Sequence, residues 1–159
     1  MRIFLDIGAH IGETLEEVLK EKYAFDRIIC FEPSKTCLES LEKYSERDSR
    51  VEVLQIGLSN ATCVQKLYNS GELNGSIFSD GESLEKNSES INLVDASAWY
   101  SENISEDDFV VIKTNCEGSE VKIVDSFLKG NTFEHFYSLL ITFDIRDYPS
   151  LAYQEIEIR

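Results

Sequence analysis

Short apolar runs alternate with longer amphipathic stretches along the first third of the chain. The apolar runs lie at residues 2–7, 27–31 and 51–56, and each ends near a glycine or proline. Such runs predict buried strands. Residues 13–22, and a segment that Ser34 could cap and that runs to about Arg47, carry apolar residues at helical spacing. The resulting strand–helix–strand–helix–strand order predicts a parallel sheet with right-handed crossovers.

The rest of the chain continues this alternation less regularly. Further strands are predicted at 63–68, 91–94, 109–114 and 138–143, and helices at 96–103 and 119–128, the last followed by a stop at Gly130-Asn131. Residues 69–90 are rich in Gly, Ser, Asn and Glu, which predicts a mobile loop. Five of the strands fit a parallel arrangement, so we expect an α/β fold in one domain, residues 1–159.

The charge balance narrows the classes of function. The chain holds 15 basic and 30 acidic residues, a formal net charge of −15. Such a surface repels phosphate backbones and anionic lipid, so neither a nucleic-acid nor a membrane partner is expected. No apolar run is long enough to span a bilayer and no signal peptide is recognisable, so a cytoplasmic location is expected. Solubility is the simpler explanation of the acidity itself.

The cysteines indicate no metal site. Cys30, Cys37, Cys63 and Cys116 form no CxxC pair, and neither histidine lies near a cysteine cluster. Free thiols are then the default in a reducing compartment, and no structural zinc is predicted. Cys116 has no His or Asp at a recognisable spacing, which favours burial as a small apolar residue over a nucleophilic role.

The first candidate for chemistry is the turn D-I-G-A-H-I-G, residues 6–12, between a predicted strand and a helix. Glycines there let the backbone approach a ligand, and the helix N-terminus adds positive potential. The G-x-x-x-G spacing differs from the G-x-G-x-x-G cradle for a pyrophosphate. It suits a ligand without phosphates but with a cationic amino-acid part, which Asp6 would help to hold. A purely structural glycine turn is the alternative.

The second and third candidates also follow predicted strands, and the carboxyl edge of a parallel sheet is where such folds bind ligands. Glu32 lies 20 residues after Gly12 and could accept hydrogen bonds from a ribose diol. Lys113, Asn115 and Glu117 lie at the end of the strand at 109–114, placed to orient a polar acceptor or to take its proton. The alternatives are an exposed acidic turn for Glu32 and, for the other segment, helix capping by Glu117 or Ser119.

The sequence resembles the FkbM-type methyltransferases, a branch of the class I S-adenosylmethionine-dependent fold. F-L-D-I-G-A-H-I-G-E-T at residues 4–14 resembles the opening cofactor motif of that family, and C-F-E-P-S at 30–34 its ribose-binding segment. I-G-L-S-N at 56–60 resembles the segment near the adenine, and residues 111–120 resemble the K-x-D-x-E-G-x-E signature. The resemblance implies a Rossmann-like sheet and methyl transfer to a hydroxyl of a sugar or another small metabolite, without a metal.

The resemblance also implies roles for individual residues. The expected contacts to S-adenosylmethionine, and to the product S-adenosylhomocysteine, are Asp6, Gly8, Ala9, His10, Gly12, Thr14, Glu32, Pro33, Gly57, Leu58 and Asn115. The expected catalytic group comprises Glu117, His10, Asn115 and Lys113. Glu117 is the first candidate for the proton acceptor and His10 the second.

Two departures from the family pattern keep alternatives open. Asn115 stands where the family usually has Asp, and 16 residues follow Phe143, which is short for a complete class I sheet. The sheet is therefore expected to be shortened after its fifth parallel strand, with an edge that could form a homo-oligomer. A catalytically impaired scaffold protein is one rival function. An NAD-dependent oxidoreductase is another, disfavoured by the missing G-x-G-x-x-G.

Overall fold

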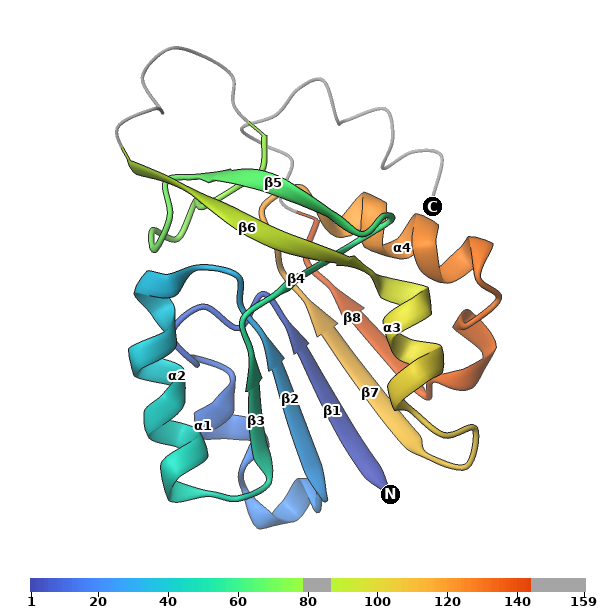
Figure 1. The fold of residues 1–159 in the computed structure, drawn as a ribbon. Coiled ribbons are helices and arrows are strands. Elements are labelled where there is room, and N and C mark those ends of the chain that lie inside the picture. Colours follow the sequence, from blue (N-terminus) through green and yellow to red (C-terminus); the bar gives the residue numbers. More distant parts are fainter. Residues whose placement is uncertain (79–86, 144–159) are drawn as a thin grey trace.

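A five-stranded, all-parallel sheet forms the centre of the protein (Figure 1). The computed structural model describes residues 1–78 and 87–143. The strands, in spatial order, are β3 (Val51–Leu54), β2 (Arg27–Phe31), β1 (Arg2–Ile7), β7 (Phe109–Thr114) and β8 (Ser138–Ile141). All four neighbouring pairs are parallel, which confirms the predicted α/β class. The chain winds outward in both directions from β1, so β1 and β7 flank the point where strand order reverses.

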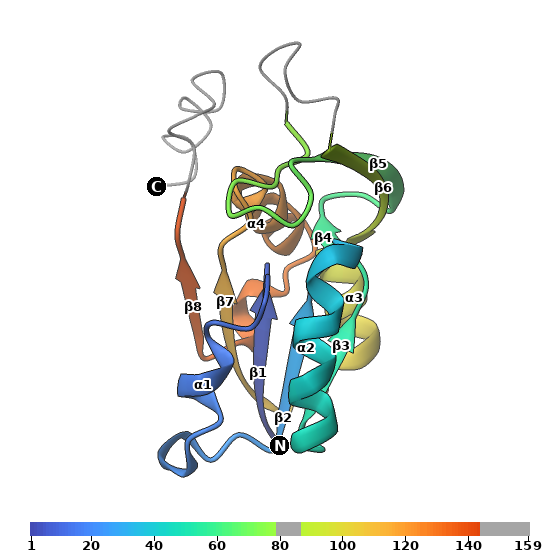
Figure 2. The ribbon, with the colours of Figure 1, turned by 90° about the vertical axis from the view of Figure 1, so that its left-hand side faces the viewer.

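Helices cover both faces of this sheet. Figure 2 shows α1 (Leu15–Val18) and α2 (Lys35–Arg47) on one face, and α3 (Ala96–Asn103) and α4 (Glu120–Lys129) on the other. Alternate residues of each strand pack on opposite faces, so Phe4 joins one core cluster with α1 and α2, whereas its neighbours on β1 join the other with α3 and α4. Burial on both faces explains why the strands appear in the sequence as continuous apolar runs.

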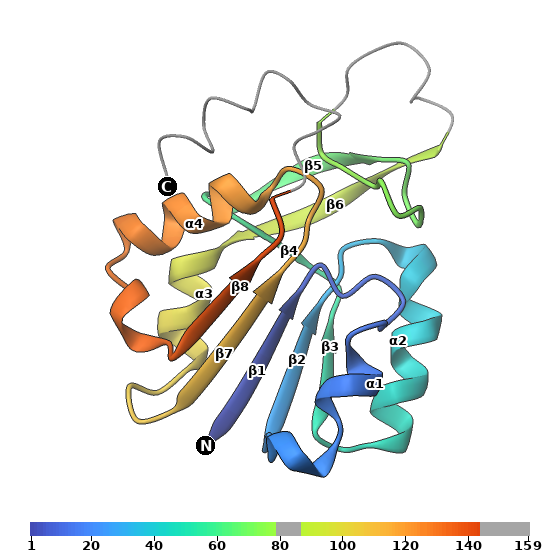
Figure 3. The same cartoon turned by 180° about the vertical axis from the view of Figure 1, so that it is seen from behind.

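A second, three-stranded sheet lies across the carboxyl ends of the main strands (Figures 1 and 3). Its order is β4 (Gly57–Ser59), β6 (Ser88–Asp95) and β5 (Cys63–Tyr68), with β4 parallel and β5 antiparallel to β6. Its buried side chains Leu67, Ile91 and Leu93 form a small apolar cluster of their own. The sequence pattern predicted β5 and part of β6, but it predicted no strand at β4, because Gly57 was expected to end the third strand.

Several predicted boundaries were wrong. The helix expected at 13–22 is only α1, because Lys20 is extended (φ −63°, ψ 137°) and a short 3₁₀ segment, Glu21–Tyr23, follows. The strand expected at 51–56 ends at Leu54, because the Ile56 N–H turns back to the Leu54 carbonyl at 2.8 Å. The strand expected at 138–143 ends at Ile141. Part of the loop expected at 69–90 lies outside the described residues, and its last three residues belong to β6.

The cap of α2 is supplied from another part of the chain. Ser34 is the N-cap residue, but its side chain makes no cap hydrogen bond and instead pairs with the Ser70 hydroxyl at 2.7 Å. The Lys35 N–H donates to Glu89 on β6 at 3.1 Å. The N-terminus of α2 is therefore tied to the second sheet, and the local cap that Ser34 suggested in the sequence was wrong.

Two further features bear on the expectations. Among residues 1–78 and 87–143, no helix is long and apolar enough to cross a membrane. Within the same residues β8 has a strand partner on one side only, and Leu140 on it is 54% exposed. Association of two copies through this edge stays a prediction, as does the single domain over 1–159.

We predict that Ile112→Ala lowers the free energy of unfolding by about 2–5 kcal/mol, because Ile112 on β7 is fully buried in the larger core cluster and its truncation leaves a cavity. Chemical denaturation monitored by circular dichroism measures the change. Val64→Thr on β5, where Val64 is 68% exposed, is the control and should change the free energy by less than about 0.5 kcal/mol. Equal effects of the two substitutions would contradict the assigned core.

Candidate functional site

A pocket of about 390 Å³ opens where the carboxyl ends of the main strands meet the second sheet. It lies beside the reversal of strand order between β1 and β7, the expected ligand position in an open α/β sheet. Most of the predicted site residues line it: Gly8, His10, Thr14, Glu32, Pro33, Gly57, Leu58, Lys113, Asn115 and Glu117. Four segments far apart in the sequence therefore converge on one cavity, as the motif positions predicted.

Three predicted cofactor contacts do not line the pocket. Asp6 is fully buried at the end of β1, and Ala9 packs in the core cluster under α1 and α2. Gly12 faces α2, since a Cβ there would come within 2.8 Å of the Tyr44 ring. These residues shape the turn from behind, so any contribution of theirs to ligand binding is indirect.

The glycine turn is held against two neighbouring loops. Gly8 (φ +78°) and Ala9 both donate their N–H to the Phe31 carbonyl, at 3.0 and 3.1 Å. A Cβ on Gly8 would lie 2.2 Å from the backbone oxygen of Asn115. Glycine is therefore required at position 8 for packing as well as for its left-handed backbone. The structural explanation of this glycine is compatible with the ligand-binding explanation, which stays a prediction.

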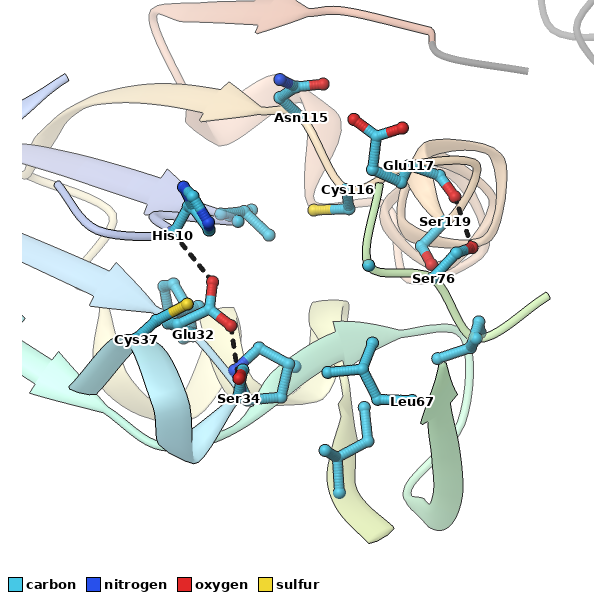
Figure 4. Close-up of a pocket in the computed structure, with 18 of the residues that line it drawn as sticks. His10, Glu32, Ser34, Cys37, Leu67, Ser76, Asn115, Cys116, Glu117 and Ser119 are labelled. Carbon is cyan, nitrogen blue, oxygen red and sulfur yellow. Dashed lines mark hydrogen bonds between the residues drawn. The ribbon is translucent and has the colours of Figure 1, made fainter. Parts of the chain in front are cut away.

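Glu32 is a buried carboxylate with a fixed orientation (Figure 4). Only 7% of the residue is exposed. Its Oε2 accepts the His10 N–H and its Oε1 accepts the Ser34 N–H, both at 2.8 Å. Burial raises the pKa of Glu32, and the two N–H donors oppose that rise by stabilising the charged form. Each oxygen retains a lone pair for a further donor, as a ribose diol would supply.

The ammonium group of Lys113 binds the glycine turn. Its Nζ donates to Asp6 Oδ1 at 2.8 Å and to the Gly8 carbonyl at 2.9 Å. Burial raises the pKa of Asp6, and the ammonium of Lys113 opposes that rise. This pair neutralises the one fully buried aspartate of the turn, so Lys113 has a structural role in addition to its place in the pocket wall.

Two buried oxygen atoms lack a hydrogen-bond partner among the described residues: Asp6 Oδ2 and Asn115 Oδ1. Both are acceptors, and buried acceptors normally have a donor. Asn115 lines the pocket, so a ligand that supplies N–H donors, such as an α-ammonium group, would satisfy its Oδ1, whereas Asp6 does not line the pocket. The donor set needed here therefore fits the amino-acid part of S-adenosylmethionine.

His10 is bound at both ring nitrogens. Nδ1 lies 2.8 Å from Glu13 Oε1, and Nε2 lies 3.4 Å from the Gly71 carbonyl oxygen. Both neighbours are acceptors, so only the doubly protonated ring donates to both. Partial burial lowers the pKa of His10, but the bonds to Glu13 and Gly71 outweigh it and the net shift is upward. A protonated ring has no lone pair to accept a proton, so this arrangement does not support His10 as the base.

Glu117 lies across the pocket from His10 (Figure 4). Both residues have left-handed backbones, with φ values of +48° and +50°. Left-handed non-glycine residues are uncommon and concentrate at functional sites. The capping role suggested for Ser119 was wrong, because Ser119 is the N-cap residue of α4 but its side chain makes no cap hydrogen bond. Glu120 accepts the N–H groups of Cys116 and Gly118, which precede the helix, the latter at 2.9 Å.

The sequence reasoning missed one wall of the pocket. The residues concerned lie on the second sheet and the loop beside it: Leu67, Ile77, Ile91 and Leu93, with Ser34, Cys37 and Ser76 nearby. No local motif marks them, because β4, β5 and β6 pair across long stretches of chain. Within the described parts of the chain, no cluster of three potential metal ligands occurs.

The parallel sheet and the position of the pocket define a Rossmann-like α/β fold. The structure matches the crystal structure of methyltransferase FkbM from Methylobacillus flagellatus KT with a TM-score of 0.57 and 20% sequence identity. The match covers 100% of this chain but 38% of the other. No family model matches the chain, and no curated protein matches its sequence. At this identity the likeness confirms the fold that the motifs implied.

We predict that the pKa of His10 lies above its ordinary value of 6.5, and that Glu13→Gln lowers it, because the neighbouring carboxylate favours the charged ring. Titration of the ring protons by NMR measures both values. The imidazolium contribution to stability is complete below about pH 6.5 and is lost as the pH rises through the raised pKa. Glu21→Gln, which removes a distant acid, should leave the His10 pKa unchanged, and a similar drop in both variants would contradict the specific pairing.

Proposed function

We propose that this protein is an S-adenosylmethionine-dependent methyltransferase that acts on a hydroxyl group of a sugar or another small metabolite. The observation that carries the proposal is the polar end of the pocket. It presents an oriented carboxylate, Glu32, together with Asn115 Oδ1, a buried acceptor that lacks a donor among the described residues. That set matches a ligand with a ribose diol and an ammonium group.

The charge of the pocket wall separates this cofactor from a dinucleotide. Among the described residues, four carboxylates line the pocket, those of Glu13, Glu32, Glu72 and Glu117. The basic groups among the same lining residues are His10 and Lys113, and both already contact acidic partners. A pyrophosphate would be repelled by this field, whereas a sulfonium ion would be attracted. The charge pattern therefore disfavours the oxidoreductase alternative.

Each end of the pocket suits one part of the cofactor. Glu32 would accept the ribose hydroxyls, and the apolar surface of Pro33, Leu58 and Leu93 would contact the adenine. Asn115 and the turn at Gly8 would hold the amino-acid part. The cofactor supplies a methyl group already activated as a sulfonium substituent, so the protein mainly aligns an acceptor.

Glu117 is the residue we assign as proton acceptor. As the acceptor oxygen bonds to the methyl carbon, the carbon–sulfur bond breaks and the hydroxyl proton passes to the Glu117 carboxylate. His10 is already a donor to two acceptors, which leaves Glu117 for this role. A catalytically impaired binding protein is the second candidate, and Asn115 in place of the family's aspartate favours it.

Calorimetric titration with S-adenosylhomocysteine tests the cofactor. We expect micromolar binding that Glu32→Ala weakens about 10- to 100-fold, because hydrogen bonds to a charged acceptor are lost. Glu52→Ala is the matched control, an acid on β3 that pairs with Arg27 at 2.8 Å, and it should change the affinity little. Absence of binding by the folded chain, or binding of NAD in its place, would refute the proposal.

Glu117→Gln tests the chemistry separately. We expect methyl transfer from tritiated S-adenosylmethionine to fall at least about 100-fold, because the amide cannot accept the proton. The affinity for S-adenosylhomocysteine should change less than about threefold, since Glu117 is not assigned a cofactor contact. A rate equal to that of the unchanged protein would remove Glu117 from the mechanism. Cofactor binding without transfer to any hydroxyl compound would favour the impaired binding protein.

A further inference from the structure

The backbone at Glu117 adopts a conformation that its own residue type disfavours. Glu117 has φ +48° and Gly118 has φ +97°, two successive residues in the left-handed region. For a residue with a Cβ this costs free energy, and it persists only where the surroundings enforce it. Hydrogen bonds from other residues must therefore hold the backbone on either side of Glu117.

Glu120 accepts hydrogen bonds from the N–H groups of Cys116 and Gly118, the residues on either side of Glu117. Its side chain has no exposed surface, although it carries a carboxyl group. The carboxylate accepts the Cys116 N–H and the Gly118 N–H, the latter at 2.9 Å. A carboxylate only accepts hydrogen bonds, so it matches two converging donors. Burial of such a group is tolerated only with partners of this kind.

Ser76 binds the Glu117 carbonyl group, which lies along the chain between those two N–H groups. Its hydroxyl donates to the Glu117 carbonyl oxygen at 2.6 Å and accepts the Phe78 N–H at 3.2 Å (Figure 4). Ser76 is 2% exposed and belongs to the segment that follows β5 in the second sheet. The loop at Glu117 is thus held by α4 from one side and by the second sheet from the other.

The same loop contacts the glycine turn. A Cβ on Gly8 would lie 2.2 Å from the Asn115 carbonyl oxygen and 2.9 Å from the sulfur of Cys116. The position of residues 115–118 is therefore coupled to the turn proposed to hold the amino-acid part of the cofactor. Movement of Glu117 relative to that turn would change the distance between the base and the methyl group.

We propose that Glu120 and Ser76 are positioning residues that fix Glu117 in its left-handed conformation and so aim its carboxylate at the acceptor. The aim of the carboxylate at an acceptor rests on the proposed methyltransferase function. The fixing of the backbone does not, because it follows from the hydrogen bonds that Glu120 and Ser76 make to residues 116–118. A carboxylate is required at position 120, since the amide of glutamine would bring its own N–H donors against a backbone N–H.

The test uses Glu120→Gln and Ser76→Ala in the full chain, with Asp95→Asn as the matched control. Asp95 accepts the Ala98 N–H at 2.9 Å at the start of α3, so its variant makes the same carboxylate-to-amide change at a backbone N–H away from the pocket. The three-bond HN–Hα coupling and the Cα shift of Glu117, measured by NMR, report its φ directly. Amide exchange at Gly118 reports the bond to Glu120.

We expect Glu120→Gln to move the Glu117 coupling and Cα shift out of the left-handed range and to speed exchange at Gly118 about tenfold or more. Ser76→Ala should shift the same signals by a smaller amount, and Glu120→Asp should restore part of the change. Asp95→Asn should leave them unchanged. The affinity for S-adenosylhomocysteine should change less than about threefold in all variants.

Unchanged Glu117 signals in a folded Glu120→Gln protein would overturn the proposal. If that variant does not fold, Ser76→Ala decides, because unchanged signals there would overturn it equally. Failure of the unchanged protein to bind S-adenosylhomocysteine would instead refute the proposed function, while the backbone signals would still report on Glu120 and Ser76. Backbone signals that shift together with a loss of methyl transfer, at unchanged cofactor affinity, would support both.

Discussion

The arrangement of the site depends on one buried carboxylate. Glu32 accepts the N–H of His10 from the glycine turn and the N–H of Ser34 from the start of α2, and so joins two turns that are separate in sequence. An ionised group at 7% exposure is stable only with such donors. The turn at residues 6–12 therefore takes its shape from the same group that we assign to the ribose. In the proposed complex, different lone pairs of this carboxylate would hold the fold together and bind the ribose.

The other acidic residues at this edge of the sheet have different ion-pair or hydrogen-bond partners, and these partners distinguish their roles. Asp6 is neutralised by Lys113, and Glu120 is bound by backbone N–H groups at the start of α4. Glu117 instead lines the open pocket on a left-handed backbone. In a chain of net charge −15, the acids that we assign to the proposed site are two whose side chain or backbone is held by hydrogen-bond donors, Glu32 and Glu117. The formal charge alone did not identify them.

The sequence predicted the main sheet well because its strands are buried on both faces. Continuous apolar runs such as residues 109–112 of β7 follow from that burial, and the ends of the strands placed Glu32 and Glu117 at one edge. The second sheet was harder, because β4 is three residues long and its pairing with β6 depends on distant segments. For the same reason, the sequence could not predict the cap of α2 by Glu89 or the hydrogen bond between His10 and Gly71. Local patterns predict elements, whereas contacts between loops depend on the completed fold.

The most direct test of the assigned site is a crystal structure of the protein with S-adenosylhomocysteine. We predict that the ligand occupies the pocket between the glycine turn and the second sheet, with its ribose hydroxyls on the Glu32 carboxylate and its ammonium group near Asn115 Oδ1. A ligand bound elsewhere, or one in the pocket whose ribose does not contact Glu32, would contradict the assignment of this site.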